Sequence, residues 1–203
     1  MAITKAEILA FTNSRLQRAD TASSIEESIK MILRDISSYY VLEDTDTSQS
    51  LTSSSMSLDY PSDALDGEQA IKSVILTDSS SIQQAPLEYI KGGWRDYNRL
   101  LDQFVEGSRS YPSNMTIYGR TIYLWPPPSA SYTVSIEYFK RHAETVDTIE
   151  YSEDWRNTIL FGVTREVAYD NKMGDQIVLW ENRYMIERDR QINLHRNDVA
   201  IVE

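Results

Sequence analysis

The side chains that could carry out covalent chemistry in this 203-residue chain are few and scattered. Its two histidines, His142 and His195, lie far apart, and neither has a second histidine at the helical spacing that zinc enzymes use. The chain has no glycine-rich phosphate loop and no Gly-x-Ser-x-Gly motif. It also has no cysteine, which excludes disulfides and thiolate metal sites. We therefore expect no cofactor, no metal and no enzymatic activity.

The best candidates for acid–base chemistry are three carboxylates, Glu150, Glu153 and Asp154. Two carboxylates a few ångströms apart are enough for glycoside hydrolysis. Ser152 stands just before Glu153, however, and acidic residues at a helix start are favoured by capping and by the helix dipole. We favour this structural interpretation and keep a cell-wall hydrolase that uses Glu150 or Glu153 as an alternative.

The net charge of −11 argues against binding of nucleic-acid phosphates, which requires clustered Lys and Arg. Between Val41 and Glu88 the chain has nine acidic residues and a single basic one, Lys72. These acids could simply keep a loop region solvated. Alternatively, they could form a wall that does not bind a passing polyanion. The candidates for such a wall are Glu43, Asp44, Asp46, Asp59, Asp63, Asp66 and Glu68.

Helical patterns occur at both ends of the chain. Thr4 and Glu7 form a capping box, and a second helix carries isoleucines at helical spacing on one face. Pro86 is expected in the first turn of a helix, and Met173-Gly174 is expected to end one. The helices are expected at about 4–18, 23–40, 86–105, 152–173 and 175–193.

The segment from Tyr111 to Arg141 predicts β-structure. It contains a strand, a Gly119-Arg120 turn, a second strand, a triple proline and an alternating strand from Tyr132. With shorter strands expected within 47–78, the β-region comprises parts of 47–78 and 111–141. The fold class is therefore α+β, a helical bundle core with an inserted antiparallel β-region, and residues 1–193 are expected to form a single domain.

Two further features indicate contacts with other proteins. Thirteen tyrosines and four tryptophans exceed the need of a small core, although most of the tryptophans are expected to pack in one core. The plausible contact residues are Tyr39, Tyr40, Tyr118 and Tyr123. Residues 194–203 form an extended tail with an apolar, β-prone end, which is either a frayed terminus or a strand that docks on a partner.

The order of these parts resembles the head-to-tail connector, or portal adaptor, proteins of tailed bacteriophages. The resemblance covers roughly residues 86–184, with Leu124-Trp125-Pro126-Pro127-Pro128 and the alternating strand of residues 132–140 as its main features. It is architectural, and the Ser- and Asp-rich stretch of residues 45–57 departs from the pattern. An adaptor of this kind would form a ring, commonly dodecameric, beneath the portal, extend the DNA channel and provide the platform for tail attachment.

The resemblance also implies partners and a location. The partners would be the portal protein, tail, nozzle or tail-fibre proteins, further copies of the chain, and double-stranded DNA that passes without specific binding. The portal-docking residues would be Leu194, His195, Arg196, Asn197, Val199, Ile201 and Val202. With no signal-peptide pattern and no apolar run of membrane-spanning length, we expect assembly in the host cytoplasm, a place at the head–tail interface of the virion, and no membrane partner. A neck or tail completion protein that binds the tail tube is a further alternative.

Overall fold

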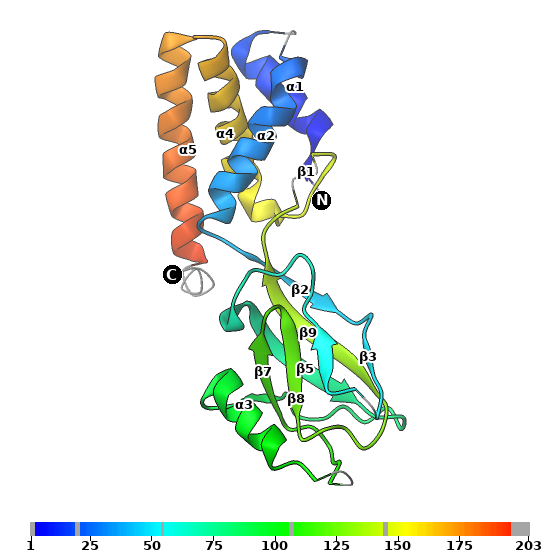
Figure 1. The fold of residues 1–203 in the computed structure, drawn as a ribbon. Helices are drawn as coiled ribbons and strands as arrows, with labels where there is room; N and C mark the ends of the chain where they lie inside the picture. Colours follow the sequence, from blue (N-terminus) through cyan, green and yellow to red (C-terminus); the bar gives the residue numbers. More distant parts are fainter. Residues whose placement is uncertain (1–2, 19–20, 54, 106–107, 144–145, 196–203) are drawn as a thin grey trace. The chain divides into compact units, whose positions relative to one another are not determined.

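The computed structural model describes residues 3–18, 21–53, 55–105, 108–143 and 146–195. The chain divides into two compact units, which are drawn in Figure 1. A helical unit comprises residues 1–42 and 141–203, and a β unit comprises residues 43–140. The β unit is thus inserted in sequence between the two parts of the helical unit. The α+β class and the inserted β-region are confirmed.

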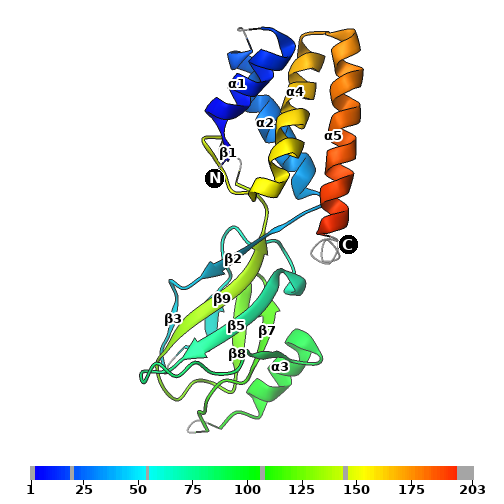
Figure 2. The same cartoon turned by 180° about the vertical axis from the view of Figure 1, so that it is seen from behind.

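Four helices form the helical unit, as far as its residues are described. In Figures 1 and 2, α4 lies between α5 and the pair α1 and α2, and it contacts all three. A short antiparallel pair, β1 with β10, joins the beginning of the chain to the segment before α4. The elements are β1 (Ile3–Thr4), α1 (Lys5–Leu16), α2 (Ala22–Ser37), β10 (Thr148–Ile149), the 3-10 helix η2 (Glu153–Trp155), α4 (Arg156–Asp170) and α5 (Gly174–Leu194).

The first two helices follow from local sequence signals. The Thr4 side chain accepts a hydrogen bond from the Glu7 backbone N–H at 3.3 Å, as expected of the first half of a capping box. The isoleucine stripe of α2 is fully buried, which confirms that this helix presents an apolar face to a core. The buried residues of this face are Ile25, Ile29, Ile32, Leu33 and Ile36.

The β unit contains two four-stranded sheets. In the first, β9 pairs with β2, β3 and β5, and in the second the strand order is β4-β8-β7-β6. The pairs of β9 with β3 and β5 and of β8 with β4 and β7 are antiparallel, whereas β6 pairs with β7 in parallel. The elements are β2 (Leu42–Asp46), β3 (Ser50–Leu51), β4 (Ser57–Asp59), the 3-10 helix η1 (Glu68–Ala70), β5 (Ile71–Thr77), β6 (Glu88–Tyr89), α3 (Gly93–Asp102), β7 (Asn114–Tyr118), β8 (Thr121–Trp125) and β9 (Tyr132–Lys140).

The hairpin of β7 and β8 forms as its sequence predicts. Tyr118 pairs with Thr121, and the two residues between them, Gly119 and Arg120, have φ angles of 56° and 58°. A two-residue turn with two positive φ angles matches the right-handed twist of the flanking strands. Strand β9 buries every second residue from Tyr132 to Tyr138, and Phe139 at its end is buried as well.

Two expected helix boundaries differ from the structure. Residues 86–92 are not helical, because the backbone N–H groups of Glu88 and Ile90 bond to the carbonyls of Ser113 and Met115, which draws this segment alongside β7. Helix α3 begins only at Gly93, where φ is +58°. Helix α4 ends at Asp170, and the left-handed residue after it is Lys172, whereas Gly174 begins α5.

The four tryptophans do not share one core, in contrast to the expectation from the sequence. Trp155 and Trp180 are buried in the helical unit, whereas Trp94 and Trp125 are half-buried in the β unit. Each unit has its own apolar cluster. The sequence alone could not show this division, because it depends on which helices and strands pack together.

Candidate interaction surfaces

The acidic segment is less charged in the folded chain than its sequence suggests. Lys140, from the end of β9, lies 2.5 Å from the Asp44 carboxylate and 3.8 Å from that of Asp63. Arg120, from the hairpin turn, lies 2.5 Å from the Asp66 carboxylate. The β9 strand and the hairpin thus supply cations that come from outside residues 41–88.

The remaining acidic candidates differ in whether they form ion pairs, accept hydrogen bonds or have no ion pair among the described residues. Glu43 pairs with Lys72 at 2.7 Å, and Asp46 accepts hydrogen bonds from Ser48 and Gln49. These hydrogen bonds, first that of the Ser48 hydroxyl, lower the pKa of Asp46. The pKa of Asp44 is lowered mainly by its bond with Lys140. Asp59 and Glu68 are exposed, and among the described residues neither forms an ion pair. All seven candidates therefore lie at or near the surface.

An aromatic cluster covers one surface of the β unit. The rings of Trp94 and Tyr118 stack with centroids 4.6 Å apart at 9°, and Tyr123 approaches Trp94 at 4.7 Å. Tyr97 lies beneath these rings and is buried, and its burial raises its pKa to about 12. Tyr118 is 55% exposed. The structure thus brings together two of the predicted contact tyrosines, Tyr118 and Tyr123, around Trp94.

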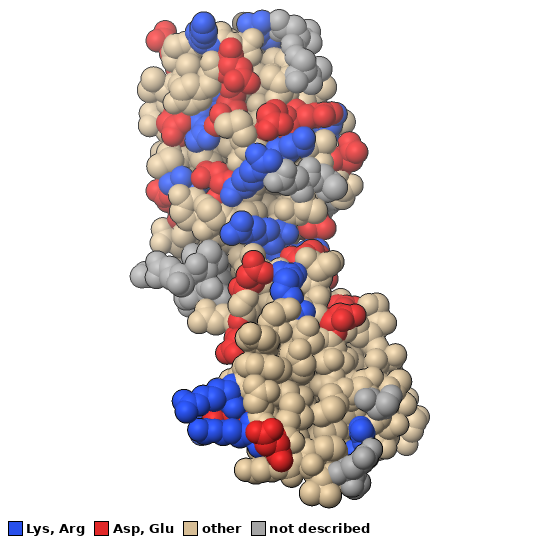
Figure 3. Space-filling model, viewed as in Figure 1, with Lys and Arg blue, Asp and Glu red and all other residues tan. Residues whose placement is uncertain are grey.

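Basic side chains border this aromatic cluster. Figure 3 shows Lys and Arg gathered over α3, and the exposed cations there are Lys91, Arg95 and Arg99. Arg99 pairs with Asp96 at 3.1 Å, whereas Lys91 and Arg95 form no ion pair within the described part of the chain. Our sequence interpretation missed Lys91 and Arg95, although a lysine and an arginine within three residues of a tryptophan are visible in the sequence.

The other two predicted contact tyrosines follow α2 in the helical unit. Tyr39 is partly exposed beneath the Arg188 guanidinium, which lies 5.1 Å from its ring centroid. Tyr40 packs against Trp155 and against His195, each with ring centroids 5.1 Å apart. Tyr40 therefore belongs to the surroundings of the α5 end.

Only the first two residues of the predicted tail lie within the described structure. Leu194 is the last residue of α5 and is 67% exposed, and the His195 ring stacks on Trp155 at 6.0 Å. The remaining predicted docking residues, Arg196, Asn197, Val199, Ile201 and Val202, lie outside the described residues.

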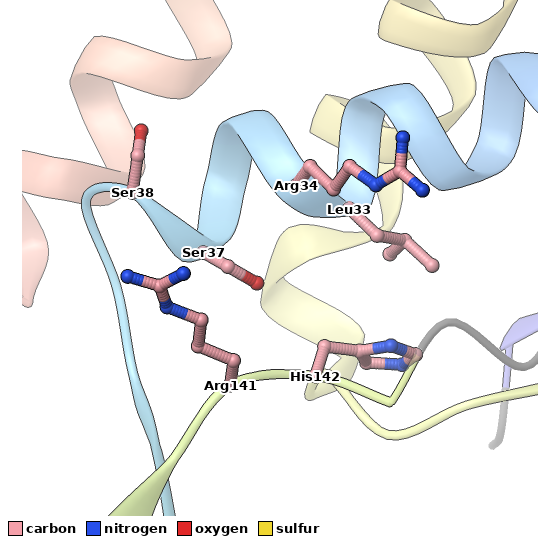
Figure 4. A pocket seen from close by; sticks show the side chains of 6 residues that line it. All are labelled: Leu33, Arg34, Ser37, Ser38, Arg141 and His142. Atoms are coloured by element: carbon pink, nitrogen blue, oxygen red, sulfur yellow. The ribbon is translucent and has the colours of Figure 1, made fainter. Parts of the chain in front are cut away.

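A pocket of about 450 Å³ opens beside the C-terminal end of α2 in the helical unit. Ser37 Oγ is bonded to the Tyr151 hydroxyl at 2.8 Å, and Ser38 Oγ donates to the Asp35 carbonyl at 2.6 Å. Figure 4 shows the Arg34 and Arg141 guanidinium groups on opposite sides of Ser37. The residues that line this pocket are Leu33, Arg34, Ser37, Ser38, Arg141 and His142.

The position of this pocket accounts for its arginines. A helix C-terminus carries a partial negative charge, which nearby guanidinium groups complement. The same charge disfavours a bound anion, and the two guanidinium groups do not converge on one point (Figure 4). We therefore interpret these arginines as stabilising the end of α2.

Among the carboxylates considered for hydrolysis, that of Glu153 takes part in an ion pair. Glu153 pairs with Arg156, and that hydrogen bond lowers the pKa of Glu153. A general acid near neutral pH needs a raised pKa instead. The Glu150 backbone N–H donates to His142 Nε2 at 2.9 Å. In the described ranges no group of three His, Cys, Asp or Glu side chains is arranged to hold a metal ion, and no helix there is long and apolar enough to cross a membrane.

The structure thus defines an α+β protein whose candidate sites are charged and aromatic surfaces. The family model of the SU10 adaptor protein matches residues 3–200. The chain therefore belongs to the SU10 adaptor protein family, a family of phage head-to-tail adaptors, and is a structural protein of the virion. No curated protein matches it.

Proposed function

We propose that the chain forms a ring, dodecameric as is common among such adaptors, that binds beneath the portal. The ring would extend the DNA channel and provide the platform to which tail, nozzle or tail-fibre proteins attach. The observation that carries this proposal is the family match, which spans both units of the chain. We propose accordingly that residues 1–193 act as one adaptor domain and that residues 194–203 act as its tail.

The end of α5 supports a docking role for the tail. The His195 ring packs against the rings of both Tyr40 and Trp155, which anchors the residue that follows α5 to the helical unit. An extended segment that starts from a fixed point loses less freedom when it binds than one on a mobile linker. We propose that residues 194–203 bind the portal by adding an extended strand or by inserting apolar side chains.

Removal of the tail tests this docking role. A chain that ends at Asn193 is expected to bind purified portal rings at least about tenfold more weakly than the full chain, because it loses the docking segment. A second chain that ends at His195 keeps the ring contacts of His195 and isolates the contribution of residues 196–203. Affinity is measured by biolayer interferometry, and thermal unfolding shows whether the helical unit is intact. Equal binding by all three chains would contradict the docking role.

We propose that part of the acidic set lines the channel. Asp66, which is 88% exposed in its side chain, and Glu68 are the foremost candidates because of their exposure. DNA that must move through a channel benefits from walls that do not bind its phosphates. The DNA would then pass without specific binding.

The two alternative functions, a cell-wall hydrolase and a neck or tail completion protein, require different residues and partners. A hydrolase would use Glu150 or Glu153 as a proton donor, and the lowered pKa of Glu153 argues against that role for Glu153. We propose that the protein performs no covalent chemistry. A neck or tail completion protein would bind the tail tube and not the portal, so the portal-binding measurement also separates this alternative from the adaptor.

A further inference from the structure

The aromatic and basic residues at the beginning of α3 form a surface that the fold itself does not require. This basic patch consists of Lys91, Trp94, Arg95 and Tyr118. The other described basic residues of the β unit are engaged within it. Lys72, Arg99, Arg120 and Lys140 pair with carboxylates, and Arg109 donates to the Ser53 carbonyl. Lys91 and Arg95 are exposed and form no ion pair with any described residue.

The helix dipole does not account for these two cations. A helix N-terminus carries a partial positive charge, so Lys91 and Arg95 stand at the end of α3 where the dipole disfavours a cation. Asp96 in the first turn has the favourable sign, and the Glu68 carboxylate lies beside Gly93. Neither Lys91 nor Arg95 forms an ion pair with these acids, so both cations are available to a partner that supplies negative charge.

The composition of the patch is that of a protein interface. Trp, Tyr and Arg are the residues that most often dominate binding energy between proteins. The stacking of Trp94 on Tyr118, with Tyr97 buried beneath them, holds both rings before any partner arrives. A rigid aromatic surface loses little side-chain entropy on binding.

The β unit also carries an acidic edge around β2. Lys140 bridges the Asp44 and Asp63 carboxylates, and Glu43 and Asp46 lie on the same strand as Asp44. The edge retains an excess of negative charge, because among the described residues only two cations, Lys72 and Lys140, are found paired with its four acids. Its acidic residues are Glu43, Asp44, Asp46 and Asp63.

Helix α3 of the basic patch and strand β2 of the acidic edge lie on opposite sides of the β unit. Figures 1 and 2 both show α3 along one side of this unit and β2 and β3 along the other. Two complementary surfaces on opposite sides of one subunit favour a head-to-tail contact, which repeats from copy to copy and closes into a ring when the rotation allows.

We propose that the basic patch of one copy binds the acidic edge of the next copy, an inference that rests on the proposed ring. Copies with a net charge of −11 repel one another, but at physiological salt this repulsion is screened beyond about 8 Å, so contacts at short range decide. Two unpaired cations are too few for a DNA site on so acidic a chain. A second copy supplies the matching charge.

The absence of cysteine from the sequence makes a direct cross-linking test possible. Thr45, exposed on β2, and Arg99, exposed on α3 one turn after Arg95, are both replaced in the variant Thr45→Cys with Arg99→Cys, which is assembled on portal rings and treated with a short bis-maleimide. The interface predicts a ladder of covalent multimers from the double variant. Each single variant should give dimers at most. Absence of the ladder from an assembled ring would overturn the proposal.

Charge reversal provides the second readout. Arg95→Glu and Glu43→Arg are each expected to weaken assembly at least about tenfold, and the variant with both changes should recover most of it. Lys172→Glu is the matched control, an equal charge change at an exposed site of the helical unit. Native mass spectrometry on portal rings counts the subunits.

The failures of the two proposals can be distinguished. If wild-type protein forms no ring on the portal, the proposed function fails. If wild-type protein forms a ring, but the double cysteine variant gives no ladder and charge reversal does not change assembly, only the proposed interface is wrong. Loss of binding to a short double-stranded DNA by Arg95→Glu, with unchanged assembly, would instead assign the patch to nucleic acid.

Discussion

Replacement of Trp155 by alanine is expected to lower the free energy of unfolding of the helical unit by about 3–5 kcal/mol. The Trp155 side chain is fully buried, and its ring contacts Tyr40, Tyr151 and His195. Its removal leaves a cavity where η2, α5 and the segment after α2 meet. Chemical denaturation followed by far-UV circular dichroism, which reports mainly on helices, measures the change.

The matched control for this variant is Tyr169→Ala. Tyr169 is an exposed aromatic residue on α4, and its loss is expected to change stability by no more than about 0.5 kcal/mol. If Trp155→Ala lowers the free energy of unfolding by less than about 1 kcal/mol, the Trp155 ring is not central to the core of the helical unit. Because His195 stacks on Trp155, the variant is also expected to loosen the start of the tail.

Replacement of Gly162 by valine is expected to cost about 3 kcal/mol. A Cβ atom at this position would lie 2.9 Å from Ile32 Cδ1 and 2.9 Å from Tyr184 Cε2. Neither neighbour is free to move. Ile32 is fully buried in α2, and the Tyr184 hydroxyl donates to the Asp35 carboxylate. Valine therefore forces α4 away from α2 and α5, and thermal and denaturant unfolding both report the loss.

Gly174→Val is the control for this change, since a Cβ at Gly174 meets no heavy atom within 4 Å. Its expected effect is within about 0.5 kcal/mol. Equal effects of the two variants would show that the close approach at Gly162 does not determine how the helices pack.

Much of the fold follows from periodicity in the sequence. The isoleucine spacing of α2 and the alternation of β9 each specify a buried face, and Gly119-Arg120 specifies the hairpin turn. The extended conformation of residues 88–89 does not follow in this way. It depends on hydrogen bonds to residues 113–115, which local sequence does not encode.

The candidate surfaces were predictable in part. The sequence indicated Tyr118 and Tyr123 as contact residues, and the structure places both around Trp94. The acidic segment was visible as a charge run, but its partial neutralisation by Lys140 and Arg120 depends on tertiary structure. Lys91 and Arg95 differ from most of the other described cations of the β unit in forming no ion pair with a described residue, and this difference depends on tertiary structure.

Cryo-electron microscopy of the protein bound to its portal tests the proposed ring most directly. We expect a closed ring beneath the portal around an open channel, with residues 194–203 in contact with the portal and with Asp66 and Glu68 facing the channel. A map in which the chain binds only the tail tube, or binds the portal without forming a ring, would contradict it.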